Sequence, residues 1–88
     1  MKLHILPSAL EHGQKKKDIE HAIDLHVKSI QHTESDRVNT NSFDFLFIGP
    51  DRNGELLEII GFINGHKCVI FQCMPLRKKY AHYLGSEE

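Results

Sequence analysis

The sequence has no tryptophan, only two cysteines and three prolines, and no long run of apolar residues. A membrane-spanning helix needs roughly 18–20 consecutive apolar residues, and no segment of this chain approaches that length. No signal-peptide pattern opens the chain either. These absences argue against a membrane protein, and a cytoplasmic location is therefore expected.

The two cysteines, Cys68 and Cys73, fall within one predicted strand. A separation of five residues places them on opposite faces and about 16–17 Å apart, at ~3.3 Å per residue. A disulfide needs Cα atoms within about 7 Å, so this pair cannot form one. We expect reduced core cysteines, and neither residue has the features of a catalytic nucleophile.

The seven histidines have no cysteine or carboxylate at the spacing of zinc ligands. His21 and His26 are five residues apart and do not share a helix face, so they make a poor metal pair. His26 lies on an apolar stripe and is better interpreted as a core histidine. The sequence therefore predicts neither a metal site nor a cofactor.

Length and composition predict one small domain that spans residues 1–88. With 40% hydrophobic and 26% charged residues, the chain is typical of globular proteins. A domain of this size buries only roughly 60–65% of the surface that its unfolded chain exposes.

Three apolar, β-branched and aromatic runs, at residues 43–48, 56–63 and 68–74, predict strands. The connections contain Asn53-Gly54 and Asn64-Gly65, which favour tight hairpins because both residue types tolerate positive φ. The runs are too short and too uniformly apolar for amphipathic helices. We therefore expect an antiparallel three-stranded meander.

Helices are predicted on either side of this meander. Leu3, Leu6, Ala9 and Leu10 have the spacing of one helical face, and they indicate a short helix at residues 6–12 that ends before Gly13. A longer apolar stripe runs from position 19 to position 30 and predicts a second helix across the sheet. Residues 31–42 are polar and indicate an edge strand, at about residues 29–35, followed by a loop. Pro75 is expected to begin a final helix at residues 75–84.

The expected fold class is therefore α+β. Two N-terminal helices would pack on a three- to four-stranded antiparallel sheet, and a short C-terminal helix would close the domain.

Charge is distributed unevenly along the chain. Residues 18–58 hold nine acids and three bases, whereas residues 67–83 hold four bases and no acid. This polarity is compatible with a phosphate-bearing or acidic partner at the last strand and helix. The alternative is a solvated basic helix, whose last turns favour cations in any case.

Three stretches of the sequence carry a family resemblance. These are HILPSALEHGQKKKDIEHAI, FLFIGPDRNGELLEII and MPLRKKY. They resemble the RelE/BrnT-type toxins of type II toxin–antitoxin systems, whose members share a His- and Arg-containing helix, a D-[IV]-E-x-A-[IL] helix, an [IV]-G-x-D-x-x-G hairpin and a closing M-P-x-R-x-K-[YF]. The resemblance implies a RelE-like fold. Ser8 and His12 stand where the family has arginines.

The resemblance also implies a metal-independent endoribonuclease, an mRNA interferase. Arg77, Lys79 and Tyr80 match the catalytic positions of the closing motif, and His4 and His12 are the acid–base candidates, because imidazole titrates near neutral pH. The implied RNA-binding set consists of cations that would bind phosphates and aromatic rings that would stack on bases. These residues are Arg77, Lys78, Lys79, Tyr80 and Tyr83. The implied partner is a cognate antitoxin, DNA-binding and encoded by a neighbouring gene.

A different class of function remains open. A non-catalytic interaction module of the same fold would bind another protein through its sheet edge or an apolar groove. The absent arginines at Ser8 and His12 favour this alternative, and the closing MPLRKKY favours the toxin. In the alternative, Tyr80 and Tyr83 would pack the last helix onto the sheet.

Overall fold

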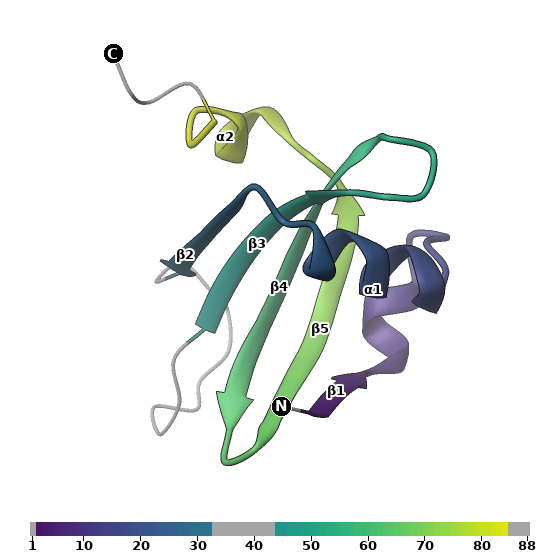
Figure 1. Cartoon of the computed structure of the whole chain (residues 1–88), viewed down its shortest axis with the longest axis vertical. Coiled ribbons are helices and arrows are strands. Elements are labelled where there is room, and N and C mark those ends of the chain that lie inside the picture. Colours follow the sequence, from purple (N-terminus) through teal and green to yellow (C-terminus); the bar gives the residue numbers. More distant parts are fainter. Residues whose placement is uncertain (1, 33–43, 85–88) are drawn as a thin grey trace.

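The fold is a single five-stranded mixed sheet with short helical segments on its two faces (Figure 1). The computed structural model describes residues 2–32 and 44–84. In chain order its elements are β1 (Lys2–Ile5), the 3-10 turn η1 (Pro7–Leu10), α1 (Lys16–Asp24), β2 (Lys28–His32), β3 (Asp44–Pro50), β4 (Leu56–Asn64), β5 (Lys67–Pro75) and α2 (Lys78–Ala81). The strand order is β1-β5-β4-β3-β2.

The three strands predicted from the apolar runs are present as β3, β4 and β5, and they pair antiparallel as expected. Their connections are tight, but only the glycines take positive φ, at +90° for Gly54 and +64° for Gly65. In the first hairpin the side chain of Asp51 accepts backbone hydrogen bonds from Asn53 (2.8 Å) and Glu55 (2.9 Å). The carboxylate therefore shapes this turn, as aspartate commonly does.

The predicted fold class is wrong at the N-terminus, which contributes a strand and one true helix rather than two helices. Residues 2–5 form β1, which pairs parallel with β5 and makes the sheet mixed. The alternation of Leu3 and Ile5 toward the core has a period of two, and this outweighs the helical spacing that we read there. The predicted helix at residues 6–12 is only the η1 turn, which begins at Pro7.

The second predicted helix is also shorter than its apolar stripe. α1 ends at Asp24, Val27 is 60% exposed, and Ile30 belongs to the edge strand β2. His26 is exposed and not a core histidine; its Nδ1 lies 2.7 Å from the carbonyl oxygen of Ile23 at the helix end. The helix stops here because residues 28–32 pair antiparallel with β3 instead. The rest of the predicted edge strand and loop, residues 33–43, lies outside the described residues.

The C-terminal helix is shorter than predicted as well. Pro75 closes β5, in register with Leu57, and α2 begins only at Lys78.

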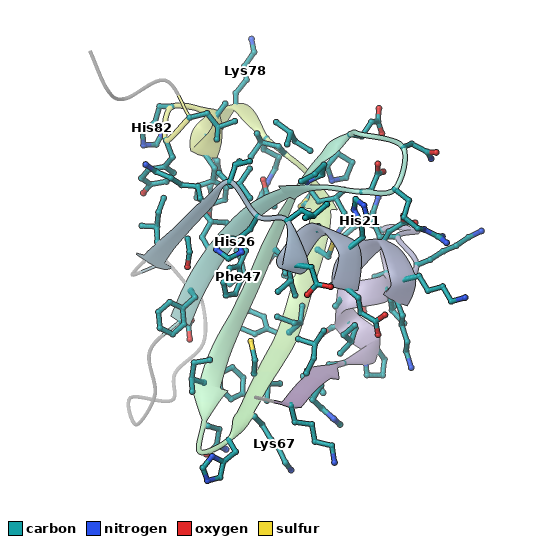
Figure 2. All side chains as sticks on the ribbon, in the orientation of Figure 1. His21, His26, Phe47, Lys67, Lys78 and His82 are labelled. Atoms are coloured by element: carbon teal, nitrogen blue, oxygen red, sulfur yellow. The ribbon has the colours of Figure 1, made fainter. Side chains whose placement is uncertain are left out.

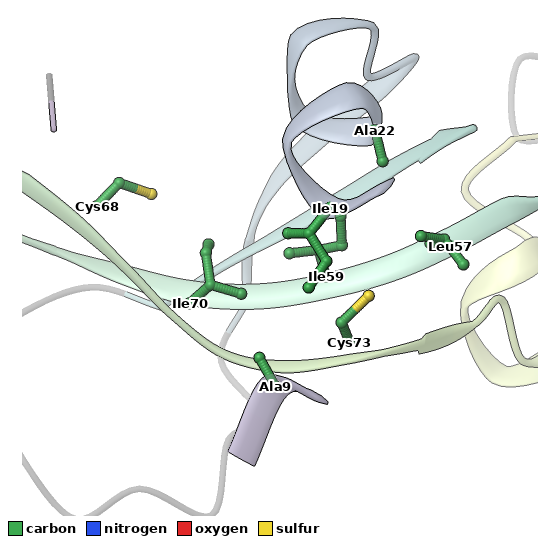
Figure 3. Packing of buried hydrophobic residues seen from close by; sticks show 8 residues of the cluster. All are labelled: Ala9, Ile19, Ala22, Leu57, Ile59, Cys68, Ile70 and Cys73. Atoms are coloured by element: carbon green, nitrogen blue, oxygen red, sulfur yellow. The ribbon is translucent and has the colours of Figure 1, made fainter. Parts of the chain in front are cut away.

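Both faces of the sheet carry a hydrophobic cluster. The cluster on the face covered by α1 and η1, here the α1-face cluster, is drawn in Figure 3. It consists of Ala9, Ile19, Ala22, Leu57, Ile59, Cys68, Ile70 and Cys73. The cluster on the opposite face, here the α2-face cluster, consists of Leu46, Ile48, Ile60 and Tyr80. Side-chain alternation along β3 and β4 supplies both clusters from the same strands.

A bulge in β5 brings both cysteines to one face. Ile60 pairs with Gln72 while Gly61 pairs with Ile70, so Phe71 is an extra residue that the register with β4 skips. An extra residue reverses the alternation beyond it. Cys68 and Cys73 therefore both lie in the α1-face cluster, and the prediction of opposite faces is wrong.

Both cysteines are buried and free. Burial raises the pKa of the Cys73 thiol to about 12, and the charges of Glu58 and Asp18 add to the shift. A thiol with so high a pKa is a poor nucleophile at neutral pH.

α1 lies unusually close to β3, because Gly49 has no side chain. A Cβ at this position would overlap the carbonyl oxygen of Ala22. An ion pair fixes the start of the same helix: Asp18 accepts hydrogen bonds from the backbone N–H (3.0 Å) and Nε (2.9 Å) of Arg52. The side-chain hydrogen bond from Arg52 is the main reason that the pKa of Asp18 is lowered.

We expect Gly49→Ala to lower the free energy of unfolding by about 1–3 kcal/mol, because the new methyl group must push α1 away from β3. Urea denaturation would measure the change. Gly54→Asn is the control, since nothing lies within 4 Å of its Cβ position and asparagine tolerates positive φ. Equal losses for the two variants would contradict the proposed close contact.

Candidate functional site

The strongest polar contact in the described structure joins Glu58 of β4 to Arg77, the residue before α2. Glu58 is completely buried, and it accepts hydrogen bonds from the backbone N–H and the Nε of Arg77, each at 2.8 Å, and from Nη2. The contact with Glu58 raises the pKa of Arg77 above its ordinary value. Nε and Nη2 of this guanidinium are therefore engaged inside the protein, where they hold the C-terminal segment on the sheet.

Tyr80, the aromatic candidate of the closing motif, is buried against the sheet. It is 4% exposed and belongs to the α2-face cluster. The guanidinium carbon of Arg77 lies 5.5 Å, and Nζ of Lys79 4.9 Å, from the centre of its ring. Its ring also stacks with that of Tyr83, at 6.4 Å between centroids. Tyr80 thus anchors α2 while two cations lie over it.

The two histidine candidates lie far from α2. His4 is exposed on β1 in register with Val69, six residues along β5 from Pro75, which corresponds to about 20 Å. His12 is exposed after η1, and η1 packs on the face opposite α2. Figure 1 shows β1 and α2 at opposite corners of the sheet. The structure therefore brings the closing-motif residues together but leaves both histidines outside their reach.

The surface around α2 is basic. Lys78, Lys79 and His82 are exposed, and Figure 2 labels Lys78 and His82 at the end of the molecule away from the β4–β5 turn. The ring of Tyr83 is half-buried and lies 4.1 Å from that of His82. We call Lys78, Lys79 and His82 the basic end. It could contact an anionic partner, but it contains no exposed acid–base pair of the kind predicted from the sequence.

The α1 face carries a pocket of about 420 Å³, here the sheet pocket. Its walls come from the C-terminal half of α1 and from all five strands, and its lining is mostly apolar. The lining residues are Leu3, Ile23, Asp24, Ser29, Phe45, Phe47, Ile63 and Cys68.

The sheet pocket exists because α1 is too short to cover its face of the sheet. Nine helical residues span about 14 Å, whereas the nine-residue strands β4 and β5 span about 30 Å. Phe45 and Phe47 of β3 lie beyond the helix, half-buried, with their rings stacked at 6.4 Å. The edge of Phe47 also meets the ring of His26 at 5.3 Å.

Four of these functional candidates were not singled out from the sequence, although signals for three were present. Glu58 is the one acid in the apolar run 56–63, which is typical of a buried charge that needs a cation. Phe45 and Phe47 alternate with Leu46 and Ile48, which indicates a strand that is apolar on both faces. No local signal places Asp24 at a pocket, because the pocket is lined by residues distant in sequence.

No protein-family model matches the chain, and neither a curated protein nor a solved structure is significantly similar to it. Residues 2–32 and 44–84 contain no group of three or more metal-ligating side chains that could hold an ion. Within the same ranges, neither helix is long and apolar enough to cross a membrane.

The Glu58–Arg77 contact predicts that Arg77 matters for stability. We expect Arg77→Ala to lower the free energy of unfolding by about 2–3 kcal/mol, less than for a fully buried pair because the Arg77 side chain is 38% exposed. The loss arises because the buried carboxylate of Glu58 would keep its charge without its cation.

Lys78→Ala is the matched control, since it removes a neighbouring positive charge that is exposed, and it should change stability by less than about 0.5 kcal/mol. Chemical denaturation of both variants would measure the difference. If both variants were as stable as the parent, Arg77 would be free for another role.

Proposed function

We propose that this protein is a non-catalytic protein-binding module, which takes a segment of a partner protein into the sheet pocket. The observation that carries the proposal is the pocket itself: an open, mostly apolar hollow beside the aromatic pair Phe45 and Phe47. Ligand-binding sites are usually concave, mostly apolar pockets with a few polar groups.

The surroundings of the pocket support the same function. Leu25 and Val27 directly follow α1 and are 55% and 60% exposed. Among the described residues β2 is the last strand of the sheet on this side, and Ser29 of β2 lines the pocket. A partner segment could therefore bury exposed apolar side chains next to an edge strand, which is a recurring mode of peptide recognition.

The dispersal of the candidate catalytic groups favours binding over catalysis. A general acid or base must lie within about 3 Å of the group that it protonates, directly or through one water. His4 and His12 lie at the far edge and on the other face of the sheet from α2. Arg77 is engaged by Glu58, and Tyr80 is buried.

The resemblance to type II toxins suggests the identity of the partner. In this proposal the bound segment belongs to an antitoxin encoded by a neighbouring gene. The two proteins would form a complex in which this chain contributes the pocket.

The test is to purify this protein with each neighbour-encoded product and to measure the affinity of any complex by calorimetry. We expect Phe45→Ala to weaken the complex at least about fivefold, because truncating a buried aromatic anchor typically costs more than about 1 kcal/mol of binding energy.

Phe62→Ala is the matched control. Phe62 is a half-buried phenylalanine of the adjacent strand β4, and its ring contacts Phe71 on the opposite face. It should leave the affinity within about twofold. A complex weakened by Phe62→Ala but not by Phe45→Ala would place the interface on the other face.

A second candidate function, RNA binding, is favoured by one observation: Lys78, Lys79 and His82 are exposed together beside the ring of Tyr83. Cations that neutralise phosphates and a ring that stacks on a base are the elements of single-strand recognition. This function would use the α2 face and would not compete for the sheet pocket.

RNA binding can be tested with the double variant Lys78→Ala/Lys79→Ala. On a single strand, each phosphate contact adds roughly 0.7 to the steepness of log affinity against log salt. If both lysines contact phosphates, the slope should therefore be less steep by about 1.4 in the double variant. Filter binding of a single-stranded RNA over a range of salt concentrations would measure it.

Lys16→Ala/Lys17→Ala removes the same charge from exposed positions on α1 and serves as the control. Equal slopes for the two double variants would mean that the basic end attracts RNA only through net charge.

A further inference from the structure

One acidic side chain, Asp24, stands at the edge of the sheet pocket. It is the last residue of α1, it is exposed, and it is the one charged residue of the pocket lining. The other lining residues are apolar except for Ser29. A ligand in the pocket would therefore meet an apolar floor and a single negative charge at the rim.

The position of Asp24 is unfavourable for the helix itself. The carboxyl end of a helix carries a partial negative charge, so an acid there is destabilising. Glu20 lies one turn earlier on the same helix face, and like charges four residues apart repel each other. Asp18, by contrast, lies at the favourable amino end and pairs with Arg52.

No cation within residues 2–32 and 44–84 compensates Asp24, which makes no ion pair there. The nearest lysines along the lining strands do not enter the pocket. Lys2 and Lys67 precede the lining residues Leu3 and Cys68 in their strands, so alternation directs them to the opposite face. Lys28 likewise precedes the lining residue Ser29, and it pairs with Ile48 of the α2-face cluster. A charge that lowers helix stability and has no internal partner is more simply explained by an external one.

We infer that the segment bound in the sheet pocket presents a large apolar side chain next to a lysine or arginine, whose cation pairs with Asp24. The inference rests on the proposed function and adds the chemistry of the partner. The apolar side chain packs against Phe45, Phe47 and Ile63, and the cation reaches the rim. The negative end of α1 strengthens the field there, because its partial charge has the same sign as the carboxylate.

The test uses three capped tetrapeptides that contain Phe-Lys, Phe-Gln or Phe-Glu between glycines. Each is titrated into the labelled protein while amide shifts of β3 and β4 are followed by NMR. We expect the Phe-Lys peptide to bind about two- to fivefold more tightly than the Phe-Gln peptide, the range for an exposed ion pair, and the Phe-Glu peptide to bind most weakly. Added salt should reduce these differences.

Asp24→Asn should abolish the preference for Phe-Lys over Phe-Gln. The same variant should melt at a slightly higher temperature than the parent, because the helix end loses an unfavourable charge. Glu20→Gln is the matched control: it removes the same charge from the same helix face, outside the pocket lining, and should keep the preference.

The outcomes separate the two levels of the proposal. If the three peptides bind the pocket equally, or if Asp24→Asn keeps the preference for Phe-Lys, the partner chemistry inferred here is wrong while the pocket remains a binding site. If Glu20→Gln abolishes the preference as Asp24→Asn does, the effect belongs to the charge of α1 as a whole and the inference is also wrong. If none of the peptides changes the amide chemical shifts of β3 and β4, both the inferred partner chemistry and the proposed function are wrong.

Discussion

The central hairpin of β4 and β5 must be covered on both faces, and this requirement shapes the rest of the structure. Leu57 and Ile59 are buried on one face, while Glu58 and Ile60 are buried on the other. Within residues 2–32 and 44–84, short segments cover these faces: α1 and η1 on one side, α2 on the other. Each cover therefore depends on a specific anchor rather than on a large contact area.

The two ion pairs within the described residues serve as such anchors. Asp18–Arg52 ties the start of α1 to the β3–β4 turn, and Glu58–Arg77 ties the C-terminal segment to the sheet. The second pair has the larger consequence, because a fully buried carboxylate is costly unless a cation and hydrogen bonds accompany it. This explains why an arginine of the closing motif, which the resemblance interprets as catalytic, has a structural contact in this chain.

The incomplete cover has a functional consequence. Since α1 spans only about half the length of the strands beneath it, Phe45 and Phe47 remain half-buried and the sheet pocket stays open. A small domain would be more stable if this surface were filled. Its persistence beside Asp24, an acid without an ion pair among the described residues, is the reason that we propose a partner for this face. The basic end lies on the opposite face, so the two surfaces could be occupied independently.

The sequence by itself determined the features that depend on neighbours along the chain. The three strands β3, β4 and β5 and their glycine turns follow from apolar runs and Asn-Gly pairs, and the local pattern sufficed because hairpins join segments that are adjacent in sequence. It also grouped the cations and rings of the closing motif, which are close in space because they are close in sequence. The candidate RNA-binding surface was therefore predictable, and the packing of Tyr80 on the sheet was one of the two alternatives that the sequence left open.

Tertiary structure decided what depends on distant residues. Residues 2–5 form a strand because β5, more than sixty positions later, offers an open edge, and α1 ends at Asp24 because residues 28–32 pair with β3. The bulge at Phe71 placed both cysteines on one face, against the alternation that their spacing predicted. The fold pairs Arg77 with Glu58, nineteen residues away in sequence. It also forms the sheet pocket from residues of one helix and all five strands. No local pattern carries this information, because a periodicity describes a single segment. Strand pairing, burial and pockets depend on tertiary contacts between segments that are distant in sequence.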